Sequence, residues 1–202
     1  MNMTQGEKSV NFNNYKIKKI ASVIFELVKI IVIALAIVIP IRYFLIQPFY
    51  VKGASMEPTF YDHEYLIVNE VTYRMNEPKR GDVIVFKYPR NPEQYFIKRV
   101  IALPGESIKI ENGSVYIKEV DSEDWLLLDE SVYLDESVKT YPYFETDVSE
   151  DEYFLMGDNR SSSLDSRIFG AVQKVVTIGR TWLRAWPMDR ITHFKNIKYD
   201  ID

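Results

Sequence analysis

A long apolar stretch near the N-terminus constrains this chain more than any other feature. Residues 30–41 read Ile-Ile-Val-Ile-Ala-Leu-Ala-Ile-Val-Ile-Pro-Ile without a charge, and the apolar character continues to Ile46 with Arg42 as the only interruption. A membrane-spanning helix needs about 20 predominantly apolar residues. A helix that is apolar on every side has no buried place in a domain of this size. The stretch therefore predicts one transmembrane helix over residues 23–46.

Charged residues around the stretch predict its orientation. Glu26 and Lys29 are three residues apart, so they fall on one helix face and can pair. Lys29 and Arg42 lie near opposite ends of the run, where both can reach the headgroups. Lysines at positions 8, 16, 18 and 19 precede the span. The positive-inside rule then predicts a cytoplasmic tail at residues 1–22 and places residues 47–202 outside the membrane.

Two alternatives exist for this segment. A cleaved signal peptide is one, because Ala34-Leu35-Ala36 resembles an A-x-A cleavage site. These alanines lie within the apolar run, however, whereas a cleavage site follows such a run. A buried core helix is the other, and the small size of the domain argues against it. An uncleaved anchor is the better interpretation.

The composition excludes several kinds of chemistry. The chain has no cysteine, which excludes disulfides, thiolate catalysis and cysteine-based metal sites. His63 and His193 are its two histidines, so imidazole catalysis has few options. The formal net charge of −4 gives no electrostatic reason to expect a nucleic-acid partner.

Short β-branched runs bounded by polar residues follow the anchor and predict strands. Asn112-Gly113 between two alternating runs predicts a hairpin over residues 107–118. Residues 121–151 are acidic and poorly patterned, which predicts a long surface excursion with one hairpin at most. Further strands are expected at residues 65–68, 83–86, 96–102, 152–156 and 171–183. The fold class is therefore mainly β, with one domain behind one membrane helix.

Three segments carry residues suited to catalysis. Ser55 follows two small residues in a predicted turn, which leaves its hydroxyl accessible, although most serines in such turns have no catalytic role. Lys98 lies in a predicted strand with two partly apolar faces. By pattern alone it is a surface lysine, but a buried lysine loses several pKa units and can act as a base near neutral pH. Residues 156–167 form a dense polar loop that fits either an ordinary surface loop or a hydrogen-bonded scaffold.

Together these segments resemble the type I signal peptidases, the bacterial Ser-Lys leader peptidases. Five blocks occur in the order of that family: the membrane span, GASMEPT around Ser55, RGDVIVF from Arg80, KRVIALPGE from Lys98 and GDNRSSSLDSR from Gly157. A chance match to all of them is not credible. The resemblance runs from the anchor to Leu183, and the single short anchor is similar to the compact Gram-positive form. It implies a catalytic domain of coiled β-sheets attached to the outer membrane face.

The resemblance also implies roles for individual residues. Ser55 would be the nucleophile. Lys98 would be the general base that takes the Ser55 proton, gives it to the leaving amine and then activates the deacylating water. Ser163 aligns with a serine that hydrogen-bonds the lysine amine. No metal and no cofactor are expected.

Other residues of the polar loop align with supporting positions of the family. Asp158, Asp165 and Arg167 would hold this loop and the lysine strand in place, and Arg99 is the expected partner of Asp158. The chain departs from one branch of the family at Gly53, where that branch has a serine that serves the oxyanion hole. Phe60 also replaces a commoner leucine.

The implied substrate is the signal peptide of an exported preprotein. Residues 49–52 would pair with it as an added strand, and shallow pockets would admit small side chains at substrate positions −1 and −3. The candidate substrate-binding residues are Phe49, Val51, Gly53, Met56, Phe96 and Ile97. Membrane lipid and, by proximity, the secretion translocase are the other expected partners.

Three other functions are considered. A Ser-His-Asp hydrolase would need one of the two histidines, but neither lies in a recognisable motif, and we interpret both as surface or structural residues. A self-cleaving repressor would need a soluble DNA-binding segment in place of the membrane helix. An inactive tethered binding protein conflicts with the presence of Ser55, Lys98 and Ser163. Trp182 and Trp186 alternate with arginines, a pattern that fits either contact with headgroups or core packing.

Overall fold

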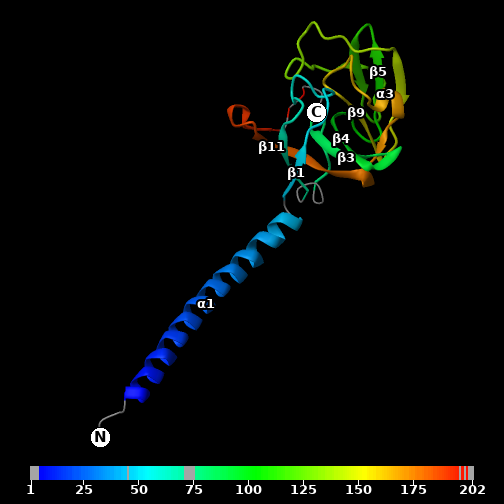
Figure 1. Cartoon of the computed structure of the whole chain (residues 1–202). Coiled ribbons are helices and arrows are strands. Elements are labelled where there is room, and N and C mark those ends of the chain that lie inside the picture. The colour runs from blue at the N-terminus through cyan, green and yellow to red at the C-terminus, as the bar shows by residue number, and fades with distance from the viewer. Residues whose placement is uncertain (1–4, 45, 71–75, 196, 198, 200–202) are drawn as a thin grey trace. The chain divides into compact units, whose positions relative to one another are not determined.

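The computed structural model describes residues 5–44, 46–70, 76–195, 197 and 199, and it divides after Phe44 into two compact units. The first is helix α1 (Gln5–Phe44), drawn in blue in Figure 1. Its segment Lys18–Ile39 has a mean hydropathy of 2.8 with none of it buried, which is sufficient in length and composition to cross a membrane. The predicted pair forms within it, since Lys29 Nζ lies 4.0 Å from Glu26 Oε2. The helix begins well before residue 23, so the predicted boundaries at residues 22 and 46 stay a prediction.

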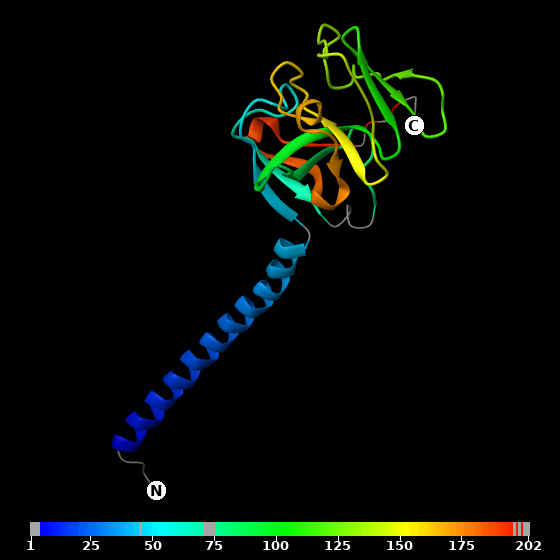
Figure 2. The ribbon, with the colours of Figure 1, turned by 90° about the vertical axis from the view of Figure 1, so that its right-hand side faces the viewer.

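The second unit contains two antiparallel sheets, which stand side by side in Figure 2. Among the described residues the larger sheet has the strand order β1-β2-β11-β3-β4-β9-β10, and β12 pairs with β11. Its strands are β1 (Ile46–Tyr50), β2 (Tyr65–Asn69), β3 (Val83–Tyr88), β4 (Asn91–Ala102), β9 (Glu152–Met156), β10 (Val172–Gln173), β11 (Thr177–Trp186) and β12 (Thr192–His193). The prediction of a mainly β fold is confirmed.

The smaller sheet is built on the predicted hairpin. Strands β5 (Ser107–Glu111) and β6 (Ser114–Lys118) pair in register, and the turn between them places Asn112 at φ 53° and Gly113 at φ 82°. Asparagine and glycine are the residues that tolerate positive φ, so this turn follows directly from the sequence. Strands β7 (Leu126–Leu127) and β8 (Phe144–Asp147) extend the sheet on its two sides.

Two predictions about the C-terminal half of the chain need correction. Residues 171–183 do not form one strand, because the 3₁₀ turn η1 (Lys174–Val176) separates β10 from β11. Residues 121–151 are mostly exposed, as expected of a surface excursion, but they do not form a hairpin of their own. They supply β7 and β8, which pair with β6 and β5 and not with each other, and they bury Leu128, Leu134 and Val148.

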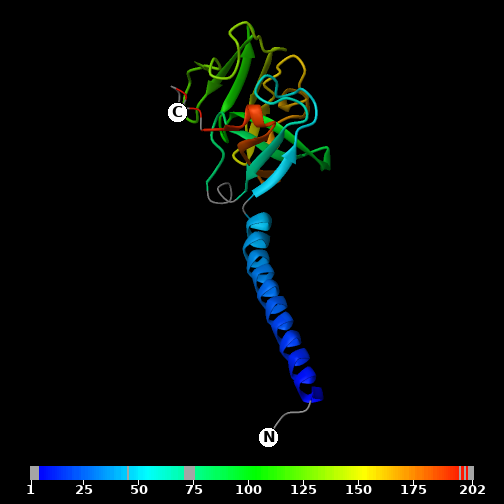
Figure 3. The same cartoon turned by 60° about the vertical axis from the view of Figure 1, so that its left-hand side comes forward.

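Two of the backbone edges that strand pairing leaves open in the larger sheet bear on the site. Strand β1, the cyan arrow in Figure 3, pairs with β2 on one side and ends the sheet on the other. Strand β4 pairs with β3 from Tyr95 to Arg99, but its pairing with β9 begins only at Arg99. Residues 93–98 therefore have a free side among the described strands. These two open edges line one groove, which also includes Ser55.

Candidate active site

The predicted nucleophile lies in a turn that is anchored in the core. Met56 and Phe60 are buried with Val51, Leu66 and Val83 in one apolar cluster. The backbone turns tightly between them, with the Phe60 amide donating to the Met56 carbonyl at 2.8 Å. These buried anchors hold Ser55, which is half-buried, at the surface of the turn.

Lys98 reaches Ser55 from strand β4. Its Nζ lies 2.8 Å from Ser55 Oγ and also donates to the Ile97 carbonyl at 2.8 Å. Only 3% of the residue is exposed, so the interpretation of Lys98 as a surface lysine is wrong. Burial lowers the pKa of Lys98 to about 8, against the opposing influence of Asp165 and Asp158. The ammonium form still predominates at neutral pH, but a far larger share of this amine is neutral than of an ordinary lysine, and the neutral form is the one that can accept a proton.

The polar loop after β9 fixes both of these residues. Arg99 donates from Nε to Asp158 Oδ1 at 2.8 Å and from Nη2 to Oδ2 at 2.6 Å, so the predicted partnership is confirmed. Thr59, from the nucleophile turn, donates to the same carboxylate at 2.6 Å. The Asn159 amide donates to the Ser55 carbonyl at 3.1 Å. Loop, nucleophile turn and lysine strand are thus joined through one buried carboxylate and one backbone contact.

Asp165 organises the far end of the loop. Its carboxylate accepts two hydrogen bonds from Arg167 and one from the Gly157 amide, and it caps the short helix α3 (Ser166–Phe169). Burial alone would raise the pKa of Asp165, but the hydrogen bonds and charge of Arg167 outweigh it and lower the pKa. The carboxylate is therefore ionised at neutral pH. The loop is a hydrogen-bonded scaffold and not an ordinary surface loop.

Ser163 lies close to the reacting groups without bonding the lysine. A Cβ placed on Gly157 would lie 2.2 Å from Ser163 Oγ and 2.4 Å from the Ser55 carbonyl oxygen, so all three residues are packed together. The Ser163 hydroxyl is buried and makes no hydrogen bond of normal geometry, although it lies close enough to the Asp165 carboxylate to help lower the pKa of that group. Lys98 donates instead to Ser55 and Ile97.

A groove of about 650 Å³ runs up to the Ser55–Lys98 pair. Residues 49–52 line one side and residues 93–98 line the other, with Val51, Leu66 and Val85 as buried apolar residues of the lining. Of the candidate substrate-binding residues, Phe49, Val51, Phe96 and Ile97 line the groove. Met56 does not, since it is fully buried in the apolar cluster beneath the turn. Gly53 is also absent from the lining and lies in the exposed turn before Ser55.

The sequence did not identify six residues of the groove lining: Leu66, Val85, Glu93, Gln94, Tyr95 and Leu164. Tyr95 lies 5.5 Å, centroid to centroid, from the ring of Phe49, so the two sides of the groove touch there. Leu164 also lines the groove, and 42% of it is exposed. A pattern could have placed Tyr95 near Ile97 on the lysine strand, but nothing in the sequence places it opposite Phe49.

The two histidines lie outside this arrangement. His63 is exposed and lies 3.0 Å from Asp62, and His193 is exposed in β12. Among the described contacts, the group that bonds Ser55 Oγ is the amine of Lys98. Trp182 and Trp186 are 41% and 50% exposed, which excludes the interpretation that they pack in the core.

Gly53 has a backbone conformation that explains its identity. Its φ is +86°, a region that other residues enter only with strain, and its amide donates to Asp62 Oδ1 at 2.9 Å. Nothing lies within 4 Å of a Cβ built there, so any cost of substitution comes from the backbone. The amide of Gly53 is already engaged by Asp62, so a second oxyanion donor from this residue is not supported.

We expect Gly53→Ser and Gly53→Ala to reduce kcat to a similar degree, because each places a side chain at positive φ at a cost of about 1–3 kcal/mol. Steady-state kinetics of both variants on one peptide would check this. A clear gain with serine, but not with alanine, would show that a hydroxyl can complete the oxyanion hole and that backbone strain is secondary.

The comparisons with known proteins point to one family. The family described as signal peptidase, peptidase S26, matches residues 24–186. A probable signal peptidase I-2 from Synechocystis sp. is 34% identical over 82% of this chain and 75% of its own length. Signal peptidase I P from Bacillus subtilis subsp. natto is 35% identical over 91% of this chain and 100% of its own.

A crystal structure of a signal peptidase I from Enterococcus faecalis V583 is 33% identical, with a TM-score of 0.42, and covers 52% of this chain and 97% of that one. The family match and the two curated relatives cover most of this chain at more than 30% identity, which establishes the family. The chain belongs to the signal peptidases of the peptidase S26 family and is a serine endopeptidase.

Proposed function

We propose that this protein is a membrane-anchored endopeptidase that removes N-terminal signal peptides from exported preproteins, with Ser55 as nucleophile and Lys98 as general base. The family supports removal of signal peptides. The observation that carries the assignment of the pair is the 2.8 Å contact between Lys98 Nζ and Ser55 Oγ, made by a buried lysine at the end of a groove. Burial gives Lys98 the lowered pKa that a base requires.

The chemistry follows from this contact. The neutral Lys98 amine accepts the Ser55 proton as Oγ attacks the scissile carbonyl carbon, which gives a tetrahedral intermediate. When the C–N bond breaks, Lys98 gives that proton to the leaving amine of the mature protein, and the signal peptide remains as an ester on Ser55. Lys98 then takes a proton from water, the hydroxide attacks the ester, and the proton returns to Ser55 as the signal peptide leaves. Ser163, packed with Gly157 and the Ser55 backbone, would turn its hydroxyl to orient the amine, as the family resemblance implies.

The open strand edges account for substrate binding. A signal peptide in extended conformation would lie in the groove between residues 49–52 and residues 93–98, and would pair with the free backbone of each side. Backbone pairing is independent of side chains, which suits an enzyme that processes many different preproteins. Val51, Leu66 and Val85 form an apolar floor that suits apolar side chains of the substrate, and the family resemblance implies that those at positions −1 and −3 are small.

The function can be tested directly on a preprotein. The full-length protein, purified in detergent, is incubated with a preprotein whose signal peptide ends in Ala-x-Ala, and the cleavage site is mapped by mass spectrometry. One cut after the second alanine is expected, and Phe at −1 should block it. Failure to cut, or equal cutting with Phe at −1, would reject the proposed function.

The rate should depend on pH through Lys98. The protonated ammonium is inactive, and its pKa is about 8, so activity is low at pH 6, rises through pH 8 and levels off above pH 9. A pH–rate profile of kcat/KM on a peptide substrate would check this. A rate that falls between pH 6 and pH 9 would contradict the assignment of Lys98 as the base.

Helix α1 supplies the proposed anchor. The helix would span the bilayer from residue 23 onward, within and beyond the apolar segment Lys18–Ile39, with residues 1–22 in the cytoplasm and residues 47–202 outside, close to the secretion translocase. A protease added to intact protoplasts should digest the β unit and spare the N-terminal tail. Protection of the β unit would reverse this orientation.

A further inference from the structure

A segment of the smaller sheet reaches the catalytic loop. Residues 129–141, here called the clamp segment, lie between β7 and β8. The segment is tied to the β5–β6 hairpin at both ends, since the amide of Leu128 donates to the Val115 carbonyl at 2.9 Å and that of Thr140 donates to the Gly113 carbonyl at 3.0 Å. Its position is therefore fixed by the sheet on which it is built.

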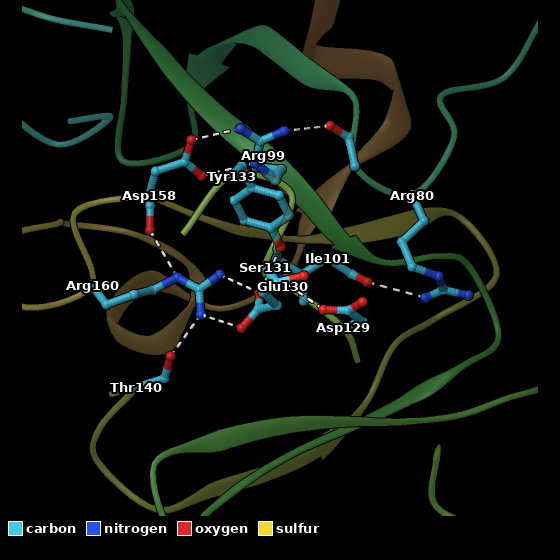
Figure 4. A network of polar contacts seen from close by, with 12 residues as sticks. Arg80, Arg99, Ile101, Asp129, Glu130, Ser131, Tyr133, Thr140, Asp158 and Arg160 are labelled. Carbon is cyan, nitrogen blue, oxygen red and sulfur yellow. Dashed lines mark hydrogen bonds and ion pairs between the residues drawn. The ribbon is translucent and has the colours of Figure 1, made fainter. Parts of the chain in front are cut away.

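The first contact of the clamp segment is with Arg160. Glu130 pairs with both terminal nitrogens of this arginine, at 2.9 Å for Nη1–Oε2, and Thr140 accepts from Nη1 at 2.6 Å (Figure 4). Only 1% of the Arg160 side chain is exposed. Its Nε donates to the Gly157 carbonyl at 3.1 Å. Arg160 thus holds its own segment of the polar loop in place. The residue before it, Asn159, donates its amide to the Ser55 carbonyl.

The second contact is with Arg99. The Arg99 guanidinium carbon lies 3.8 Å from the centroid of the Tyr133 ring, so the ring covers the arginine that binds Asp158 (Figure 4). The Tyr133 hydroxyl donates to Glu130 Oε1 at 2.6 Å. Burial and the neighbouring carboxylate raise the pKa of Tyr133 well above its usual value, so the hydroxyl stays protonated as a donor. Tyr133 and Glu130 therefore form one unit that touches both arginines.

We propose that Tyr133 and Glu130 are positioning residues for catalysis, which rests on the function proposed above. Through Arg99 they fix strand β4 beside Lys98, and through Arg160 they fix the loop that holds the Ser55 backbone. The smaller sheet thereby takes part in aligning the nucleophile and the base. A misplacement of reacting groups by about 1 Å can cost about 10²-fold in rate.

The role of Tyr133 can be separated from a purely structural one by the pH profile. Asp158 and Asp165 both raise the pKa of Lys98. Arg99 neutralises Asp158 through two hydrogen bonds, and Tyr133 shields that pair from water. If the ring is lost, Arg99 is held less firmly and the Asp158 charge acts more strongly on Lys98. The apparent pKa of the base should then rise, which simple destabilisation of the fold would not cause.

The test compares three variants of the full-length protein with the wild type on one peptide, with kcat and KM expressed per folded molecule. Tyr133→Ala removes the ring and the hydroxyl. Tyr133→Phe keeps the ring over Arg99 and removes the bond to Glu130. Tyr143→Ala is the matched control. Tyr143 also donates to a glutamate, Glu145, at 2.9 Å, but it is 63% exposed and lies just before β8 of the smaller sheet.

We expect Tyr133→Ala to lower kcat by about tenfold or more, with KM within about twofold of the wild type and the pH profile shifted to higher pH. Tyr133→Phe should keep the wild-type profile, and Tyr143→Ala should change neither value. A kcat for Tyr133→Ala equal to that of the control, or an unshifted profile, would overturn the proposal.

Two further arms keep the result interpretable. If Tyr133→Ala does not fold, Glu130→Gln replaces it. This variant keeps the shape of Glu130 but removes its charge beside Arg160. It should lower kcat by about tenfold with KM little changed. Wild-type kinetics for this variant would overturn the proposal. A wild type that does not cut the peptide, or that cuts it as well as Lys98→Ala, rejects the proposed function itself. A wild type that cuts, with Lys98→Ala inactive and Tyr133→Ala unaffected, rejects only the positioning role.

Discussion

Lys98→Ala and Ser55→Ala are each expected to abolish cleavage, with kcat lower by a factor on the order of 10⁴ or more. Ser55 provides the oxygen that forms the acyl-enzyme, and Lys98 Nζ, 2.8 Å from that oxygen, is the described group that can take its proton. Lys98→Arg should fail as well, because a guanidinium does not lose its proton near neutral pH. Single-turnover cleavage of a preprotein in detergent measures all three variants.

The matched control for this experiment is Lys109→Ala. Lys109 is also a strand lysine, less buried than Lys98, in β5, where its Nζ lies 4.8 Å from the centroid of the Trp125 ring and pairs with Glu111. It lies on the smaller sheet and has no contact with the dyad among those described, so its loss should leave cleavage intact. Substantial activity in Lys98→Ala, with Lys109→Ala near the wild-type level, would refute the proposed mechanism. Equal losses in both lysine variants would point to a general effect of removing positive charge.

The local features of the fold could be predicted because their causes are local. Asn112-Gly113 determines a hairpin turn through the φ angles that these two residues tolerate, and the structure has that turn. The apolar residues of α1 are consecutive in the sequence, so the helix could be predicted from composition alone. The pairing of Glu26 with Lys29 follows from helix periodicity. The strands near residues 65, 83 and 152 are short β-branched or aromatic runs with clear ends.

The role of residues 121–151 could not be predicted, because its causes are distant in sequence. Glu130 lies among exposed acidic residues and looks like one more of them, yet only 14% of its side chain is exposed, because it pairs with Arg160, thirty positions away. Strands β7 and β8 are two and four residues long, too short to produce a pattern. Their partners β6 and β5 decide their conformation, so tertiary pairing and not propensity determines this segment.

The active site also combines features that follow from local sequence with features that depend on contacts between distant residues. The catalytic pair could be assigned only through family resemblance, since Lys98 by pattern alone is a surface residue and its burial depends on β3 and on the loop after β9. Met56 was expected from the family resemblance to shape a substrate pocket, but a turn points neighbouring side chains in different directions, and Met56 packs in the core. Leu164 and Tyr95 reach the groove from elements that adjacency to Ser55 does not reveal.

Gly157→Ala is expected to lower kcat by about 10²-fold, although the glycine has no side chain that could act in the reaction. Gly157 follows β9, and both of its backbone polar groups are hydrogen-bonded. Its amide donates to Asp165 at 3.1 Å, and its carbonyl accepts from Arg160 at 3.1 Å. An added Cβ would lie 2.4 Å from the Ser55 carbonyl oxygen and 2.2 Å from Ser163 Oγ. The backbone cannot move away without breaking those bonds, so the nucleophile turn must move instead.

The displacement of Ser55 from Lys98 should appear as a lower kcat with KM little changed, because the groove itself stays intact. Overpacking should also lower the free energy of unfolding by about 1–3 kcal/mol. The matched control is Gly170→Ala. Gly170 has φ +91° and nothing within 4 Å of an added Cβ, so its variant carries backbone strain without a collision near the dyad. Kinetics and thermal unfolding of both variants separate the two effects: Gly157→Ala should lose activity per folded molecule, and Gly170→Ala should lose only stability. If Gly157→Ala kept more than about a third of the wild-type kcat, the close packing of Gly157 against the Ser55 carbonyl would not be what holds the nucleophile in place.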